Sequence, residues 1–154
     1  MDIHILSLWE AVHFKPTKPA YGIRINSTYL RRVPELEHEK LFRCIHTYTF
    51  NYTALDTPEQ RATDSPFSES IAQLMINDFV AEWMSCDALV IHCLSGKNRS
   101  PAAAIALNEL FGLGQDTAAL QAQYPRFDLD VYNILKTVGE RTLRSGTTQT
   151  GKTI

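Results

Sequence analysis

Apolar positions along the 154-residue chain follow two periods, one typical of strands and one typical of helices. The ranges with strand character are short, and we expect strands within residues 3–8, 21–26, 41–50 and 88–92. The last of them, ALVIH, is an apolar run. Such a run is expected of a central strand that is buried on both faces.

The helical period appears between and after these strands. One helix is predicted to begin near Ser65, Pro66 or Ser68 and to bury an apolar face that ends at Trp83. Three more are predicted over residues 101–111, 116–123 and 129–144. Because short strands interleave with helices, the sequence predicts an α/β fold, with a central, mostly parallel sheet flanked by helices.

Two segments of the chain show neither the strand period nor the helix period. Residues 51–66 are rich in Asn, Thr, Asp, Pro and Ser, which predicts a long loop. Loops of that length inside a compact domain are often functional. Residues 145–154 are rich in Gly and Thr. We therefore expect a single domain over residues 1–144 and a flexible C-terminal tail over residues 145–154.

Composition narrows the class of protein. Apolar residues make up 44% and charged residues 21%, values typical of a globular protein, and the formal net charge is −2. This balance argues against general nucleic-acid binding, so an anionic ligand would need a local positive site. The N-terminus lacks a basic region, and no stretch approaches the ~20 apolar residues of a membrane span. We expect a cytoplasmic monomer with no membrane span.

The chain contains three cysteines, Cys44, Cys86 and Cys93, and this odd, sparse set indicates free thiols. Cys44 and Cys86 are expected to be core residues with no chemical role. No role is predicted for four of the histidines, which lack metal-ligand spacing with a cysteine pair. They are His4, His13, His38 and His46.

The segment VIHCLSGKNRSP, residues 90–101, is predicted to run from a buried strand through a tight loop into a helix. Cys93 would then lie at the carboxyl end of the strand, where α/β sheets bind ligands. The backbone N–H groups of the loop, the positive end of the helix dipole and the Arg99 guanidinium would all favour its thiolate. A nucleophile inside an anion site of this size suits phosphoryl transfer through a cysteinyl phosphate.

The order His92-Cys93, five residues, Arg99, Ser100 resembles the signature of the protein tyrosine phosphatase superfamily, and Gly96 matches the family's middle glycine. About 10⁻⁴ such matches are expected by chance in a chain of this length. The order of elements resembles the small dual-specificity branch, and the resemblance is concentrated in residues 67–111.

The resemblance implies a role for each residue of the signature. Cys93 would be the nucleophile, Arg99 would bind the phosphoryl group, and Ser100 would hold the thiolate through a hydrogen bond. His92 would fix the loop without transferring a proton itself. The phosphate-binding loop would consist of Leu94, Ser95, Gly96, Lys97, Asn98 and Arg99. The family uses no metal or other cofactor for this reaction.

The family also uses an aspartic acid upstream of the cysteine as the general acid. Two candidates lie in the long loop, Asp56 and Asp64. The setting Leu55-Asp56-Thr57 resembles the acid loop of dual-specificity members, so we favour Asp56. Asp64 is nearer the family's spacing, but it directly precedes Ser65-Pro66 and could instead help to cap the helix.

The expected substrates are phosphomonoesters, with phosphotyrosine in a phosphorylated protein as the default and phosphoserine or phosphothreonine as further candidates. Lys97 directly after Gly96 resembles the loop of the phosphoinositide-acting branch, and Asn98 before the arginine resembles that of the RNA 5′-triphosphatase branch. A phosphoinositide or RNA 5′-phosphatase with the same mechanism is therefore an alternative. Two other interpretations stay open. One is a phosphate-binding module without turnover, and the other is a sulfur-transfer or arsenate-reducing enzyme with a similar loop.

Overall fold

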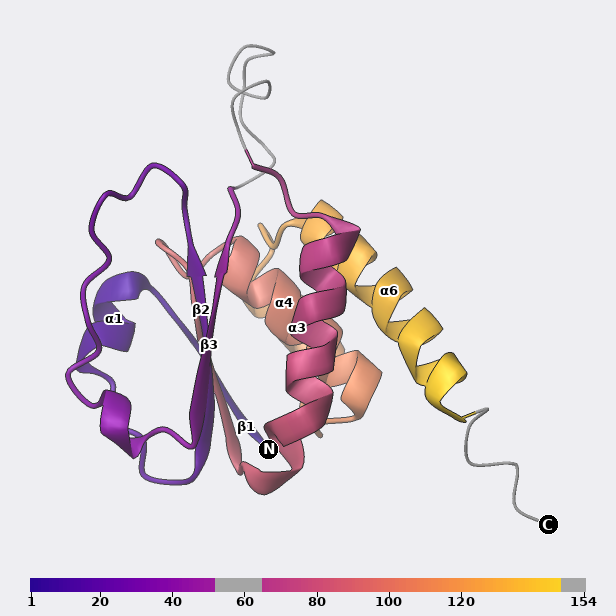
Figure 1. The fold of residues 1–154 in the computed structure, drawn as a ribbon, viewed down its shortest axis with the longest axis horizontal. Coiled ribbons are helices and arrows are strands. Elements are labelled where there is room, and N and C mark those ends of the chain that lie inside the picture. Colours follow the sequence, from indigo (N-terminus) through magenta and orange to yellow (C-terminus); the bar gives the residue numbers. More distant parts are fainter. Residues whose placement is uncertain (52–64, 148–154) are drawn as a thin grey trace.

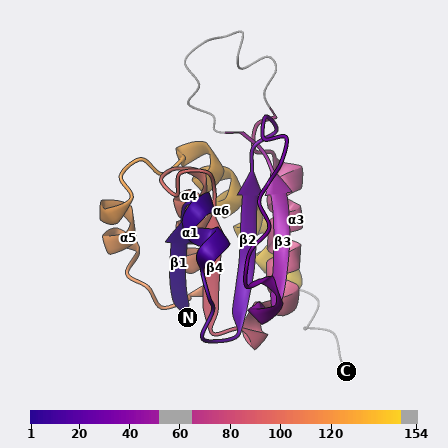
Figure 2. The same cartoon turned by 90° about the vertical axis from the view of Figure 1, so that its left-hand side faces the viewer.

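The computed structural model describes residues 1–51 and 65–147 and has an α/β fold built on one parallel sheet. Its strands are β1 (Asp2–Leu6), β2 (Ala20–Asn26), β3 (Cys44–Thr49) and β4 (Ala88–His92). They lie in the order β1-β4-β2-β3, and every neighbouring pair is parallel (Figure 2). The predicted fold class is confirmed, and the sheet of the described residues is wholly parallel.

Helices cover both faces of the sheet. The helices are α1 (Leu8–His13), α3 (Glu69–Glu82), α4 (Arg99–Phe111), α5 (Thr117–Gln123) and α6 (Leu129–Thr147), with short 3₁₀ helices η1 (Glu39–Leu41) and η2 (Trp83–Ser85). In Figure 1, α1 lies on one side of the sheet and α3, α4 and α6 lie on the other. Because α6 packs against both α3 and α4, this side is the thicker one.

Strand β4 lies at the centre of the hydrophobic core. It pairs with β1 on one side and β2 on the other, and all five of its residues are buried. Its bounds are those predicted from the apolar run. The carboxyl end of β4 therefore lies in the buried interior of the sheet.

Local cap chemistry decides where several elements begin. Helix α3 begins after Ser68, whose hydroxyl accepts a hydrogen bond from the Ile71 N–H, so of the three predicted starts Ser68 is the cap. Helix α1 was not predicted, because six residues are too few to show a helical period. A capping box between Ser7 and Glu10 defines its start.

Other boundaries differ by a few residues. The strand predicted over 41–50 begins at Cys44, helix α4 begins two residues early at Arg99, and α6 continues to Thr147. The rest of the predicted tail, residues 148–154, lies outside the described residues. Within the described ranges, no helix combines the length and the hydrophobicity needed to cross a membrane.

Candidate functional site

The loop over residues 93–98 connects the carboxyl end of β4 to the first turn of α4. Cys93 directly follows β4, and only 1% of its surface is exposed. Asn98 is the N-cap of α4, yet its side chain makes no capping hydrogen bond. The Asn98 side chain therefore does not cap the first N–H groups of α4.

The Cys93 sulfur receives hydrogen bonds from the loop around it. The Ser100 hydroxyl lies 3.2 Å from Sγ, and the Gly96 backbone N–H donates to Sγ across 3.3 Å. Burial alone raises the pKa of the Cys93 thiol. The hydrogen bonds from Ser100 and Gly96 and the charge of Arg99 outweigh burial and hold that pKa below its usual value. The site therefore favours a thiolate.

Arg99 lies beside this sulfur, and a backbone carbonyl holds its side chain in place. The residue is only 4% exposed, and its Nη1 donates a 2.7 Å hydrogen bond to the Phe50 carbonyl, just past the end of β3. This bond uses one of five guanidinium N–H groups. The rest of the guanidinium fork is thereby oriented while keeping donors for an oxyanion.

Gly96 lets the loop pack closely against the β1–α1 junction. Its φ is +72°, and a Cβ at this position would lie 2.8 Å from the Leu6 carbonyl carbon and from the Ser7 nitrogen. The next contact along this junction is a hydrogen bond from the Leu8 N–H to the Leu94 carbonyl at 3.1 Å. Only glycine satisfies both the backbone conformation and the available space.

His92 is positioned through both ring nitrogens. Arg24 Nε donates to His92 Nε2 at 3.1 Å, so Nδ1 carries the proton and faces the Cys93 carbonyl at 3.3 Å. Burial, with Arg24 and Arg99 nearby, lowers the pKa of His92 to about 4. The ring is therefore neutral at physiological pH and contacts the backbone of Cys93.

Sequence reasoning missed two residues that support the loop. Arg24 is one: besides His92, it binds the Pro34 carbonyl through Nη2 at 2.6 Å. Its only signal was a charge inside the alternating segment YGIRIN. The other is Asp128, which is 4% exposed and whose N–H donates to the Asn98 carbonyl at 3.0 Å. No local pattern distinguishes it from other aspartates at helix starts.

The remaining loop positions form the outer rim. Leu94, Ser95 and Lys97 are exposed, and the Lys97 N–H donates to the Ser95 hydroxyl oxygen at 3.3 Å. Asn98 is partly buried and anchors the loop by donating from Nδ2 to the Arg126 carbonyl at 2.8 Å. Of the predicted loop, the structure thus places Gly96 and Arg99 next to the Cys93 sulfur, while the side chains of Leu94, Ser95 and Lys97 lie on the exposed rim.

The two candidate general acids, Asp56 and Asp64, lie outside the described residues. Their segment is flanked by Asn51 and Ser65, and these two residues are joined by a 2.8 Å hydrogen bond from the Asn51 N–H to the Ser65 carbonyl. Because the neighbouring Phe50 carbonyl binds Arg99, the described residues Asn51 and Ser65 lie near the Cys93 loop.

Comparisons with models of protein families, with curated proteins and with solved structures found no match. The site is therefore interpreted from its own geometry. Its main features are a sulfur with a lowered pKa, a backbone N–H that donates to this sulfur and a buried guanidinium beside it.

Proposed function

We propose that the protein is a cysteine-dependent phosphatase that hydrolyses phosphomonoesters through a phosphocysteine intermediate. The observation that carries this proposal is the environment of one sulfur: Cys93 Sγ accepts hydrogen bonds from Ser100 and Gly96 and has a lowered pKa beside buried Arg99. The proposal rests on this geometry together with the resemblance of residues 92–100 to the tyrosine phosphatase signature.

In the first step the Cys93 thiolate attacks phosphorus, and the ester P–O bond breaks. The leaving oxygen takes a proton from the general acid, for which Asp56 is the first candidate and Asp64 the second. Arg99 and the backbone N–H groups of residues 94–99 stabilise the charge on the transferring oxygens. The Phe50 carbonyl fixes the guanidinium for this task in advance.

In the second step water attacks the phosphocysteine and the P–S bond breaks. The carboxylate of the same acid takes the proton of the water, and inorganic phosphate is released. Cys93 leaves as a thiolate, and the Ser100 hydroxyl, 3.2 Å from Sγ, stabilises the returning charge. His92 stays neutral throughout and keeps the Cys93 backbone in place.

Phosphotyrosine is the proposed substrate class, with phosphoserine and phosphothreonine as further candidates. One observation favours a second class. Lys97 is exposed on the rim, where an extra cation would attract polyanionic substrates such as phosphoinositides or RNA 5′-phosphates. The net charge of −2 weighs against nucleic acid. A cytoplasmic location and a monomeric state stay predictions.

The test is turnover of a small aryl phosphate in the presence of a metal chelator. Wild type should turn over, and Cys93→Ser should be inactive while still binding orthophosphate. Arg99→Lys should lose at least ~100-fold in kcat, because a point charge cannot replace the planar two-pronged grip on the phosphoryl oxygens. Arg141→Lys is the matched control, since Arg141 is exposed and forms a salt bridge with Glu69 on the surface.

Each outcome decides between the proposal and its alternatives. Inactive wild type that binds orthophosphate would indicate a phosphate-binding module without turnover. Turnover that survives Cys93→Ser would exclude the phosphocysteine route. Normal kcat in Arg99→Lys would remove Arg99 from the mechanism.

A further inference from the structure

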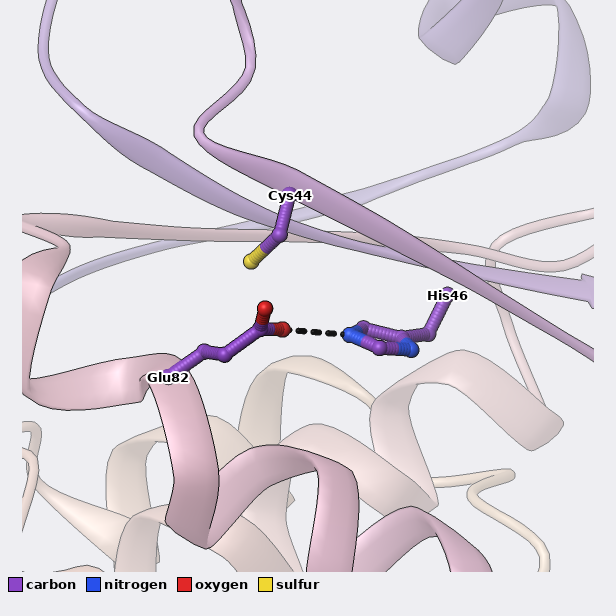
Figure 3. A group of neighbouring side chains, drawn as sticks. All are labelled: Cys44, His46 and Glu82. Carbon is purple, nitrogen blue, oxygen red and sulfur yellow. Dashed lines mark hydrogen bonds and ion pairs between the residues drawn. The ribbon is translucent and has the colours of Figure 1, made fainter.

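Three potential metal ligands meet where the edge strand β3 contacts the end of α3. Cys44 and His46 are two residues apart on β3, so their side chains lie on the same face of the sheet. Glu82 is the last residue of α3 and points toward both (Figure 3). One ligand atom from each residue lies within 4.8 Å of the other two.

The histidine of this group is held on both sides. His46 Nε2 lies 2.6 Å from Glu82 Oε2, and Nδ1 lies 3.5 Å from Asp78 Oδ2. Tyr48 fixes Asp78 in turn by donating a 2.7 Å hydrogen bond from its hydroxyl. The Tyr21 ring stacks on His46 at a centroid distance of 5.4 Å and an interplanar angle of 21°. A carboxylate behind the far nitrogen is the usual support of a metal-binding histidine.

The charges around the group also favour a cation. Asp78 and Glu82 place two carboxylates beside one histidine and one thiol. Among the residues that the structure describes, neither carboxylate forms a salt bridge with a lysine or arginine.

We propose that Cys44, His46 and Glu82 bind a zinc ion. Sulfur, imidazole nitrogen and carboxylate oxygen are the three ligand types that zinc accepts in tetrahedral sites, and three protein ligands leave the fourth position to water. The ion would tie the edge strand β3 to the carboxyl end of α3. Its role would therefore be to stabilise the fold.

This site is separate from the Cys93 loop. Cys44 aligns through Tyr21 with Leu89 of β4, four residues before Cys93, and β3 and β4 are separated by β2. At about 3.3 Å per residue along a strand and about 4.8 Å between strands, the two positions are more than ~10 Å apart. The inference is thus independent of the proposed phosphatase activity, and each can fail without the other.

The test uses Co²⁺ as a spectroscopic probe in the Cys93→Ser protein, which lacks the thiol whose pKa is lowered. We expect one Co²⁺ per chain, with a thiolate-to-cobalt charge-transfer band and the strong visible bands of tetrahedral coordination. Zinc should displace the cobalt. Cys44→Ser should abolish the charge-transfer band, and His46→Gln should weaken binding strongly. Asp78→Asn should lower the affinity about 10–100-fold as a positioning residue.

The matched control is His13→Gln, because His13 also pairs with a glutamate, Glu37, at 2.9 Å but has no thiol beside it. Its cobalt spectrum should equal that of the parent. Zinc at about 100 times its Kd should raise the Tm of the parent by about 5–10 °C and leave the Tm of Cys44→Ser unchanged. Absence of a tetrahedral spectrum in the folded parent, or a charge-transfer band that survives Cys44→Ser, would overturn the proposal.

Discussion

At the scale of single residues, the candidate site depends on which groups stay neutral and which become charged. His92 donates from Nδ1 to the Cys93 carbonyl and accepts from Arg24 at Nε2, and its pKa of about 4 keeps it neutral. Cys93 has the opposite tendency, since its lowered pKa favours the anion. A neutral histidine beside an anionic sulfur lets the ring hold the backbone without competing for the negative charge.

This difference predicts the titration of Cys93. The thiolate absorbance of wild type minus that of Cys93→Ser should give a midpoint below the ~8.5 of a free cysteine. Ser100→Ala should raise the midpoint, because it removes the 3.2 Å hydrogen bond to Sγ. Iodoacetamide at pH 6 should accordingly modify Cys93 before Cys44, whose pKa is about 12.

The same shift links stability to pH. The native pKa of Cys93 lies below the unfolded value, so the linked stabilisation is fully present above about pH 8.5. It is lost as the pH falls through the native pKa. A titration midpoint of the Cys93 thiol at or above about 8.5 would contradict the environment assigned to this sulfur. So would a titration midpoint that Ser100→Ala leaves unchanged.

At the scale of elements, sequence patterns predicted those structures whose residues are consecutive in the chain. The bounds of β4 were predicted because an apolar run ends at a polar loop, and the loop around Cys93 was predicted because its residues are consecutive. Arg24 was missed because it reaches His92 from another strand, 68 residues away. The group of Cys44, His46 and Glu82 was missed, although Cys44 is partly buried and packs against the core, as expected. Its partner Glu82 comes from α3, and only tertiary packing brings the two together.

Packing between elements also gives a prediction for Gly96. In Gly96→Ala the new Cβ meets the backbone of Leu6 and Ser7 at 2.8 Å, and the φ of +72° is strained for alanine. We expect a loss of about 2–4 kcal/mol in the free energy of unfolding, because the steric clash adds to the backbone strain. Turnover should fall by at least ~100-fold, because the donor to Sγ moves.

Gly112→Ala is the matched control for Gly96→Ala. Gly112 has a similar φ of +60° at the end of α4, but a Cβ there meets nothing within 4 Å. Urea unfolding should show a loss of about 1–2 kcal/mol with normal turnover. Equal effects of the two variants on turnover would mean that the close approach of the loop to the β1–α1 junction has no catalytic importance.

At the scale of the whole molecule, the Cys93 loop and the proposed zinc ligands lie in different parts of the sheet. The Cys93 loop opens at the carboxyl end of the central strand β4, while the proposed zinc ligands lie between the edge strand β3 and α3 (Figure 1). The chain between β3 and α3 includes Phe50, whose carbonyl binds Arg99. It leaves at Asn51, returns at Ser65, and carries both candidate acids. Since Phe50 binds Arg99 and both candidate acids follow Phe50 in the sequence, these two acids are the ones to test as the proton donor.

The last prediction concerns that proton. If Asp56 is the general acid, Asp56→Asn should affect substrates according to their leaving groups. Phosphotyrosine, whose leaving oxygen needs a proton, should lose ~10²–10⁴-fold in kcat. An aryl phosphate with a strongly electron-withdrawing ring should lose much less, because its departing oxygen is already stable as an anion.

The pH–rate profile gives a second readout of the same variant. Its acidic limb should remain, because that limb reports formation of the Cys93 thiolate, and its basic limb should flatten, because that limb reports the protonated acid. Asp64→Asn is the control and should change stability by about 1 kcal/mol with both limbs intact. The reverse pattern would transfer the role to Asp64. If both variants kept normal kcat and both limbs, the proton would have to come from outside this segment, and the position of Phe50 beside Arg99 would then serve binding alone.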